Sequence, residues 1–159
     1  MKKSILVGTT WVGNCELLDC ELVGVFASER SDALMVVARD QWACQVGRDG
    51  LCIVGGFRTL GEKSVLKNVL RCGGSAVWIV DHKLPTVYSR IYARAFVEGR
   101  LLVVSCFWIP RGIYGTVSYC AEVVQHLASR LVLWAPVGRG YLPQVAARAR
   151  RNGKVVEVH

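Results

Sequence analysis

Short apolar runs alternate along the chain with longer stretches in which apolar positions recur at helical spacing. Most of the short runs are continuously apolar, which is typical of strands that are covered by helices on both faces. They predict strands at 4–8, 22–27, 51–55, 76–80, 101–106, 131–135 and 154–158. Strands that alternate with helices in this way indicate βα units around a mainly parallel sheet.

The intervening stretches predict amphipathic helices. The clearest pattern starts at Thr116, and a second starts at Leu142 and ends at Asn152-Gly153, a typical C-terminal cap. Further helices are predicted after Ser31-Asp32, from Gly61-Glu62 to Gly73-Gly74, and over 86–98. We therefore expect an α/β fold: a single Rossmann-like domain over residues 1–159, with a mainly parallel sheet of about seven strands and helices on both faces. Residues 1–19 are expected to add an edge strand, at Ser4 to Gly8.

The composition supports a folded domain. The chain has 159 residues, of which 52% are hydrophobic and 20% are charged, so it can bury a substantial core. The apolar run 101–109 is about half as long as the roughly 20 residues that a membrane-spanning helix needs, so no such helix is predicted. The seven cysteines include no CxxC pair, so we expect neither a metal site nor a disulfide framework, and we expect a cytoplasmic location.

The charge balance points to an anionic partner. Twenty Lys and Arg residues against 12 Asp and Glu residues give a net charge of +8, which favours association with polyanions. Aromatic residues and arginines are interleaved between Tyr88 and Tyr119, a mixture typical of single-strand binding surfaces. The aromatic residues are Tyr88, Tyr92, Trp108, Tyr114 and Tyr119, and the arginines are Arg90, Arg94 and Arg111. The same mixture is typical of homodimer surfaces, so the pattern leaves both interpretations open.

Candidate ligand contacts follow three of the predicted strands, at 27–30, 54–59 and 136–141. Each stretch combines small residues with an arginine, which would let a phosphate approach the backbone and pair with a guanidinium. None of them has the GxGxxG or GxxxxGK[ST] pattern, so a nicotinamide-dependent dehydrogenase, an NTPase and a bound cofactor are not expected. The candidate phosphate-binding or ligand-binding residues are Ser28, Arg30, Gly55, Gly56, Phe57, Arg58, Thr59, Arg111, Gly138, Arg139, Gly140 and Tyr141.

From Val23 to Val158 the order of these motifs resembles the SLOG superfamily of Rossmann-like domains, and most of all the core of the DNA-processing protein family DprA (Smf). The GSR motif of that family is matched by Ala27-Ser28-Glu29, with Arg30 one place late. Its SGxARGID loop falls on 55–60, its GG pair on Gly73-Gly74, and its SGSL loop on 139–142. The resemblance implies a Rossmann-like fold that binds single-stranded DNA without catalysing a reaction.

The chain departs from the family at several basic positions. The RNR motif of DprA would fall on Cys120-Ala121-Glu122, which has no cation. In a gap-free match the arginine of SGxARGID is Thr59, and Arg58 is its nearest substitute. If the chain binds single-stranded DNA, it must therefore use a rearranged set of cations, with Arg30, Arg58, Arg111 and Arg139 as the candidates.

A more distant resemblance is to the LOG phosphoribohydrolases of the same superfamily. Their PGGxGTxxE motif aligns without gaps on 136–144 and keeps Gly138 and Gly140, but Gln144 stands at the catalytic glutamate. An amide cannot exchange the proton that general acid-base catalysis requires, so no catalytic residue is predicted.

The leading hypothesis is a non-enzymatic, DprA-like protein that binds single-stranded DNA and assembles as a homo-oligomer, with no membrane partner. The alternative is a SLOG-type sensor of a small nucleotide, or a degenerate LOG-like nucleotide hydrolase. A third possibility is a scaffold that acts through protein contacts.

Overall fold

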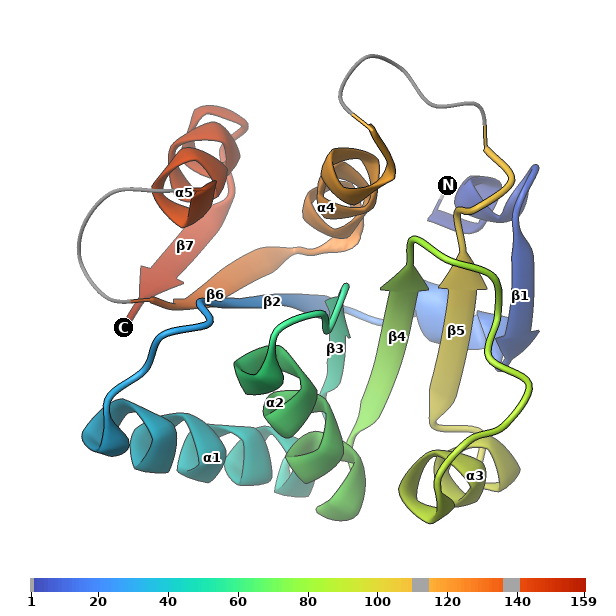
Figure 1. The fold of residues 1–159 in the computed structure, drawn as a ribbon, viewed down its shortest axis with the longest axis horizontal. Helices are drawn as coiled ribbons and strands as arrows, with labels where there is room; N and C mark the ends of the chain where they lie inside the picture. The colour runs from blue at the N-terminus through green and yellow to red at the C-terminus, as the bar shows by residue number, and fades with distance from the viewer. Residues whose placement is uncertain (1, 110–114, 136–140) are drawn as a thin grey trace.

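The computed structural model describes residues 2–109, 115–135 and 141–159, and seven strands in these ranges form one sheet (Figure 1). The strand order is β1-β5-β4-β3-β2-β6-β7, in which β1 pairs with β5 antiparallel and all other pairs are parallel. The predicted mainly parallel α/β sheet is therefore confirmed. The strands are β1 Thr10–Gly13, β2 Leu22–Ala27, β3 Cys52–Gly55, β4 Ser75–Val80, β5 Leu101–Ser105, β6 Arg130–Trp134 and β7 Val155–Val158.

Helices cover both faces of the sheet, as predicted. Along β2, Val25 and Ala27 face one hydrophobic cluster and Phe26 faces the other, which is the alternation that a strand imposes. In Figure 1, α1, α2 and α3 lie on one side of the sheet, and α4 and α5 lie on the other. The helices are α1 Ala33–Arg48, α2 Leu60–Arg71, α3 Arg90–Val97, α4 Gly115–Leu127 and α5 Tyr141–Arg151, preceded by the short 3-10 helices η1 Lys2–Leu6 and η2 Cys15–Asp19.

The predicted strand from Ser4 to Gly8 is wrong. Residues Lys2–Leu6 form η1, and Gly8 then adopts a left-handed φ of 79° that turns the chain away. The Thr9 amide and hydroxyl both donate to the Leu6 carbonyl and complete this turn. The strand in this region is instead β1, whose residues Thr10–Gly13 add to the edge of the sheet at β5.

The predicted helix over 86–98 is shorter than expected, because α3 begins only at Arg90. The segment before it is irregular, and the Tyr88 ring packs edge-on against Phe96 with ring centroids 4.8 Å apart. This contact holds Tyr88 beside the helix instead of within it.

The order of the strands places a topological switch point between β2 and β6. From β2 the chain adds β3, β4 and β5 on one side, and then crosses to add β6 and β7 on the other side. The loops that follow β2 and β6 lead there to helices on opposite faces of the sheet (Figure 1), and open α/β sheets bind their ligands at such points.

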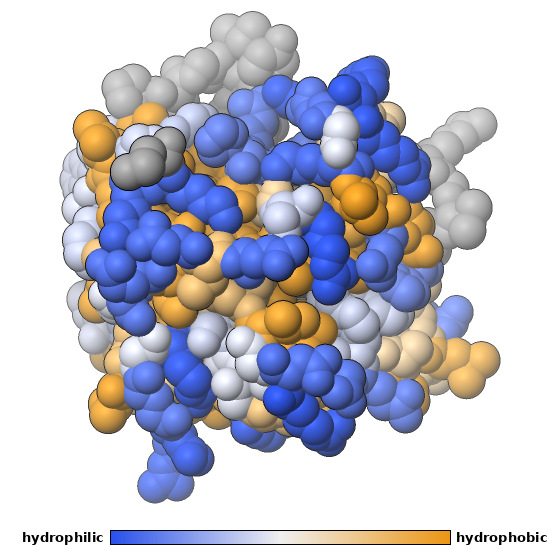
Figure 2. Space-filling view, turned by 180° about the vertical axis from the view of Figure 1, so that it is seen from behind, coloured by the Kyte–Doolittle hydropathy of each residue, from blue (hydrophilic) through white to orange (hydrophobic). Residues whose placement is uncertain are grey.

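The outer surface is predominantly polar on the face turned away from the viewer of Figure 1. Figure 2 shows hydrophilic residues over much of this face, with hydrophobic residues between them. Within the described ranges, none of the helices combines the length and the apolarity that a membrane span requires.

Two glycines allow the ends of α1 and α2 to cross closely. A Cβ atom on Gly47 would lie 2.6 Å from the Val69 carbonyl oxygen and 2.7 Å from the Cys72 Cβ. A Cβ atom on Gly74 would lie 2.9 Å from the Cα of Gly47. The position of α1 against α2 therefore depends on the absence of side chains at this crossing.

We expect Gly47→Ala to lower the free energy of unfolding by about 1–3 kcal/mol, because the added methyl group meets backbone atoms that cannot rotate away. Urea denaturation monitored by circular dichroism measures this change. Gln41→Ala, at an exposed position of the same helix, is the matched control and should change stability by less than about 0.5 kcal/mol. An equally small effect at Gly47 would show that the helices separate without strain.

Candidate functional site

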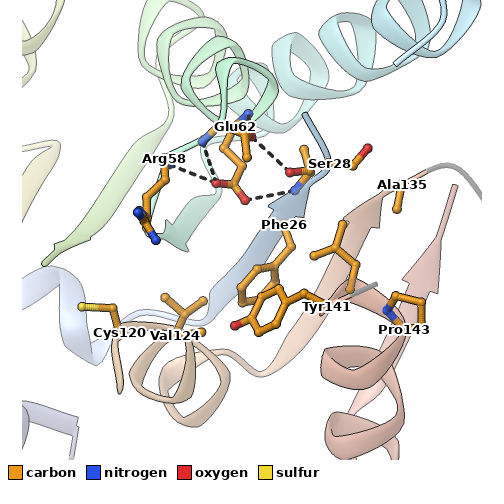
Figure 3. A pocket seen from close by; sticks show the side chains of 14 residues that line it. Phe26, Ser28, Arg58, Glu62, Cys120, Val124, Ala135, Tyr141 and Pro143 are labelled. Carbon is orange, nitrogen blue, oxygen red and sulfur yellow. Dashed lines mark hydrogen bonds between the residues drawn. The ribbon is translucent and has the colours of Figure 1, made fainter. Parts of the chain in front are cut away.

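A cavity of about 340 Å³ lies at the switch point (Figure 3). Its walls come from the ends of β2 and β6, the first turns of α2 and α5, and one face of α4. Most of the lining is apolar, and the polar groups gather where α2 begins. The lining residues are Phe26, Ala27, Ser28, Gly56, Arg58, Thr59, Glu62, Cys120, Ala121, Val124, Ala135, Tyr141, Leu142 and Pro143.

The main polar feature of the cavity is the carboxylate of Glu62, whose residue is only 7% exposed. Its Oε1 accepts hydrogen bonds from the backbone N–H groups of Arg58 (3.0 Å) and Thr59 (3.2 Å). Its Oε2 accepts one from the N–H of Ala27 (3.1 Å). The carboxylate thus links the end of β2 to the first turn of α2 (Figure 3).

Thr59 and Glu62 together form a capping box at the start of α2. The Thr59 hydroxyl accepts a hydrogen bond from the Glu62 N–H at 3.0 Å and donates one to the Ala27 carbonyl at 3.1 Å. Because both side chains also contact Ala27, the cap fixes the helix relative to β2 as well as closing its end.

Burial raises the pKa of Glu62 above the ordinary value for a glutamate, although the hydrogen bonds from Ala27, Thr59 and Arg58 oppose this shift. The Arg58 guanidinium also favours the charged form, but its ion pair is with Asp81, at 3.7 Å between Nε and Oδ2. The carboxylate is therefore satisfied mainly by backbone amides.

The buried side chain of Phe57 anchors the loop that carries Arg58. Phe57 is 1% exposed, and its φ of 46° is unusual for a residue with a side chain. Its ring packs edge-on against Trp78 with centroids 6.3 Å apart, and the Trp78 Nε1–H donates to the Gly56 carbonyl at 3.0 Å. This anchoring directs the Arg58 side chain, 51% exposed, to the rim of the cavity.

The wall formed by α4 is small and apolar. It consists of Cys120, Ala121 and Val124, and Figure 3 shows Cys120 and Val124 across the cavity from Glu62. The resemblance to the DprA family predicts the arginines of its RNR motif at Cys120 and Glu122, and neither residue is a cation. A hydrogen bond to Cys106 and burial raise the pKa of the Cys120 thiol, so at neutral pH it behaves as an apolar group.

The structure brings together part of the predicted set. Ser28, Gly56, Arg58, Thr59 and Tyr141 line the cavity. Gly55 and Phe57 are buried beneath the loop, and Arg30 is exposed on the segment that leads from β2 to α1. Four predicted positions lie outside the described residues: Arg111, Gly138, Arg139 and Gly140.

The predicted phosphate contacts at these loops stay a prediction, and the structure shows what they would compete with. The amides of Arg58 and Thr59 already donate to Glu62. The Ser28 amide donates to the Trp134 carbonyl at 2.8 Å, and the Ser28 hydroxyl donates to the Arg30 carbonyl at 2.6 Å. A phosphate at this edge would therefore depend mainly on arginine side chains.

Sequence reasoning missed Glu62 as a site residue, although a signal for it was present. The spacing of Thr59 and Glu62 is the T-x-x-E pattern of a capping box, which places the acid at the first turn after a strand. Gln144, at the position of the LOG glutamate, is exposed on α5 and lines a separate depression beside Glu122 and Arg148.

The seven cysteines are free thiols. Among the residues that the structure describes, no group of three or more His, Cys, Asp or Glu side chains is placed to hold a metal ion.

Comparisons with solved structures show the fold of the chain. DprA from Streptococcus pneumoniae superposes with a TM-score of 0.72 at 19% identity, over 94% of this chain and 54% of that protein. DprA from Helicobacter pylori, described for its single-stranded DNA binding mode, superposes with a TM-score of 0.70 at 19% identity, over 93% of this chain and 69% of that protein. The molybdenum cofactor carrier protein of Chlamydomonas reinhardtii superposes with a TM-score of 0.60 at 16% identity, over 87% of this chain and 76% of that protein. No protein-family model and no curated protein matches the sequence.

The predicted resemblance to the Rossmann-like core of DprA is thus confirmed for the fold. The chain spans about half the length of the Streptococcus pneumoniae protein. At these identities the likeness concerns architecture, and the chemistry of the site follows from its own residues.

We expect Glu62→Gln to lower the free energy of unfolding by about 1–3 kcal/mol near neutral pH. A glutamine has one acceptor oxygen and would turn its NH2 group toward a backbone N–H, leaving a buried donor unpaired. Urea denaturation measures the loss, and Glu29→Gln, at an exposed acid in the neighbouring segment, is the control.

The difference in stability between the wild type and Glu62→Gln should also depend on pH. Because the pKa of Glu62 is raised in the folded chain, the folded state retains the proton at pH values where the unfolded state has lost it. The contribution of Glu62 to the free energy of unfolding of the wild type is therefore largest at acidic pH, and it declines as the pH rises through the pKa that Glu62 has in the folded chain. Denaturation from about pH 4 to about pH 8 measures this trend, and a difference that grows with pH would contradict it.

Proposed function

We propose that this protein binds single-stranded DNA, without catalysis, and takes one nucleotide into the cavity at the switch point. The observation that carries the proposal is the cavity itself: a site of about 340 Å³, with apolar walls and a few polar groups at one end. This size and this chemistry are typical of sites that hold a small organic ligand.

The surroundings of the cavity suit a strand. Arg58 lies at its rim, and Arg30 lies on the adjoining segment, where guanidinium groups can reach phosphates on either side of an inserted base. Tyr141 is 47% exposed at the opposite wall and offers a ring for stacking. The net charge of +8 adds a long-range attraction for a polyanion.

The fold comparison adds support. The Helicobacter pylori protein, described for its binding of single-stranded DNA, shares the fold over 93% of this chain. Because this chain spans about half of the Streptococcus pneumoniae protein, whatever the rest of that protein does is no part of the proposal.

A second candidate function is the binding of a free nucleotide or a similar small ligand. It is favoured by the apolar α4 wall of Cys120, Ala121 and Val124, which offers no cation to a phosphate. The carrier protein of Chlamydomonas reinhardtii, described as carrying the molybdenum cofactor, shares the fold and supports this candidate.

We also propose self-association and a cytoplasmic location. The exposed residues Arg90, Arg94 and Val97 on α3 support the first, whereas Tyr92 of the same sequence pattern is buried in the core. The seven free thiols support the second, because a reducing compartment preserves them.

We expect a fluorescently labelled single strand to bind at low salt and to lose affinity steeply as salt rises toward physiological levels. Arg58→Glu should weaken binding about tenfold and make the salt dependence shallower, because it removes a phosphate contact. Fluorescence anisotropy measures both effects.

Arg71→Glu is the matched control. Arg71 ends α2 and is followed by β4, so it lies near the amino ends of the strands, away from the cavity at their carboxyl ends. If both reversals weaken binding equally, the attraction is general and the cavity is not the site. If no strand binds at low salt and a mononucleotide stabilises the protein against heat, the second candidate function replaces the first.

A further inference from the structure

The cavity holds an acidic group where a phosphate-binding site would hold donors. The Glu62 carboxylate points into the cavity between Arg58 and Ser28, and Phe26, Val124 and Tyr141 lie on the other side of the space (Figure 3). A ligand that fills the cavity must therefore place one edge against a buried carboxylate and its flat faces against apolar side chains.

The hydrogen bonds of Glu62 define what that edge must offer. Oε1 accepts two backbone N–H groups, from Arg58 and Thr59, whereas Oε2 accepts one, from Ala27. Each carboxylate oxygen accepts about two hydrogen bonds, so Oε2 has room for one more. An ionised carboxylate only accepts, so the ligand edge must donate, and a phosphate or a carbonyl oxygen is repelled.

Among the four DNA bases, guanine meets this requirement best. Its Watson–Crick edge presents two adjacent donors, the ring N1–H and the exocyclic N2–H2. Adenine and cytosine present a donor beside an acceptor, and thymine presents a donor between two acceptors. Once one donor occupies Oε2, the neighbouring group on the base edge still faces the negative carboxylate, which attracts a second donor and repels an acceptor.

We infer that Glu62 reads the donor edge of guanine and makes the cavity selective for a guanine nucleotide. This inference rests on the proposed function, since it names the base that enters the cavity. With the base inside, the sugar and phosphates lie toward the rim, where Arg58 is half-exposed and available to them. Glu62 then recognises the base, and Arg58 contacts the phosphates.

The test uses thymidine strands of about 15 nucleotides that carry one central dG, dI, dA or dC. Inosine lacks only the N2 amino group of guanine, so the pair dG and dI isolates a single donor. For the wild-type protein we expect the dG strand to bind about tenfold more tightly than the dI strand, and the dA and dC strands to bind no better than dI.

Glu62→Gln should abolish the preference for dG over dI. Glu29→Gln, outside the cavity, should leave the preference unchanged. Circular dichroism establishes that each variant is folded. If Glu62→Gln does not fold, the comparison of dG with dI on the wild-type protein still decides, and Glu62→Asp, which withdraws the carboxylate by one methylene, takes its place.

The outcomes separate the two proposals. Salt-dependent binding that is equal for all four strands overturns the selectivity for guanine and leaves the proposed function standing. If no strand binds, the proposed function fails, and thermal stabilisation by GMP but not IMP would assign the same edge recognition to a free nucleotide. If GMP and IMP have equal effects or none, the inference fails as well.

A hydroxyl of the sugar is the competing donor for Oε2. It predicts no difference between dG and dI, and tighter binding of a uridine strand than of the all-deoxyuridine strand of the same length. That result would place the sugar, instead of the base, against Glu62 and would overturn the inference.

Discussion

The buried carboxylate of Glu62 is the contact on which the switch-point cavity depends. It accepts N–H groups from Ala27 at the end of β2 and from Arg58 and Thr59 at the start of α2. These segments lie far apart in the sequence, since Ala27 and Glu62 are separated by 35 positions. By holding them together, one side chain fixes the inner end of the cavity and directs the loop that carries Arg58.

The same contact changes what the fold can bind. In open α/β sheets the first turn of a helix often offers its free amides to a phosphate. Here the protein supplies its own anion, and the position is occupied by a carboxylate that repels a second negative group. Together with the apolar side chains on α4, this makes the inner cavity suited to a neutral, donor-bearing group and leaves anions to the rim.

The sheet could be predicted from the sequence because its parallel strands are continuous apolar runs, and each of the six parallel-paired strands lies within about one residue of its predicted range. The error at 4–8 arose because a short apolar run does not distinguish a strand from a 3-10 turn, and Gly8 decides between them. The site was only partly predictable. Loops after strands reveal Ser28 and Arg58, but Cys120 and Val124 reach the cavity only because α4 packs beside β2, a long-range arrangement that no local pattern encodes.

The distribution of charge shows why the cavity matters more than the net charge of +8. Several of the cations are already paired on exposed parts of the surface, as Arg94 is with Glu98 and Arg148 is with Glu122. Such pairs are neutral at the distances over which salt screens, about 10 Å, so they add little to the attraction for a strand. Arg58 itself has a partner in Asp81, at 3.7 Å, and a phosphate must compete with that carboxylate for it. The proposed binding of a strand therefore depends more on contacts inside the cavity than on the net charge.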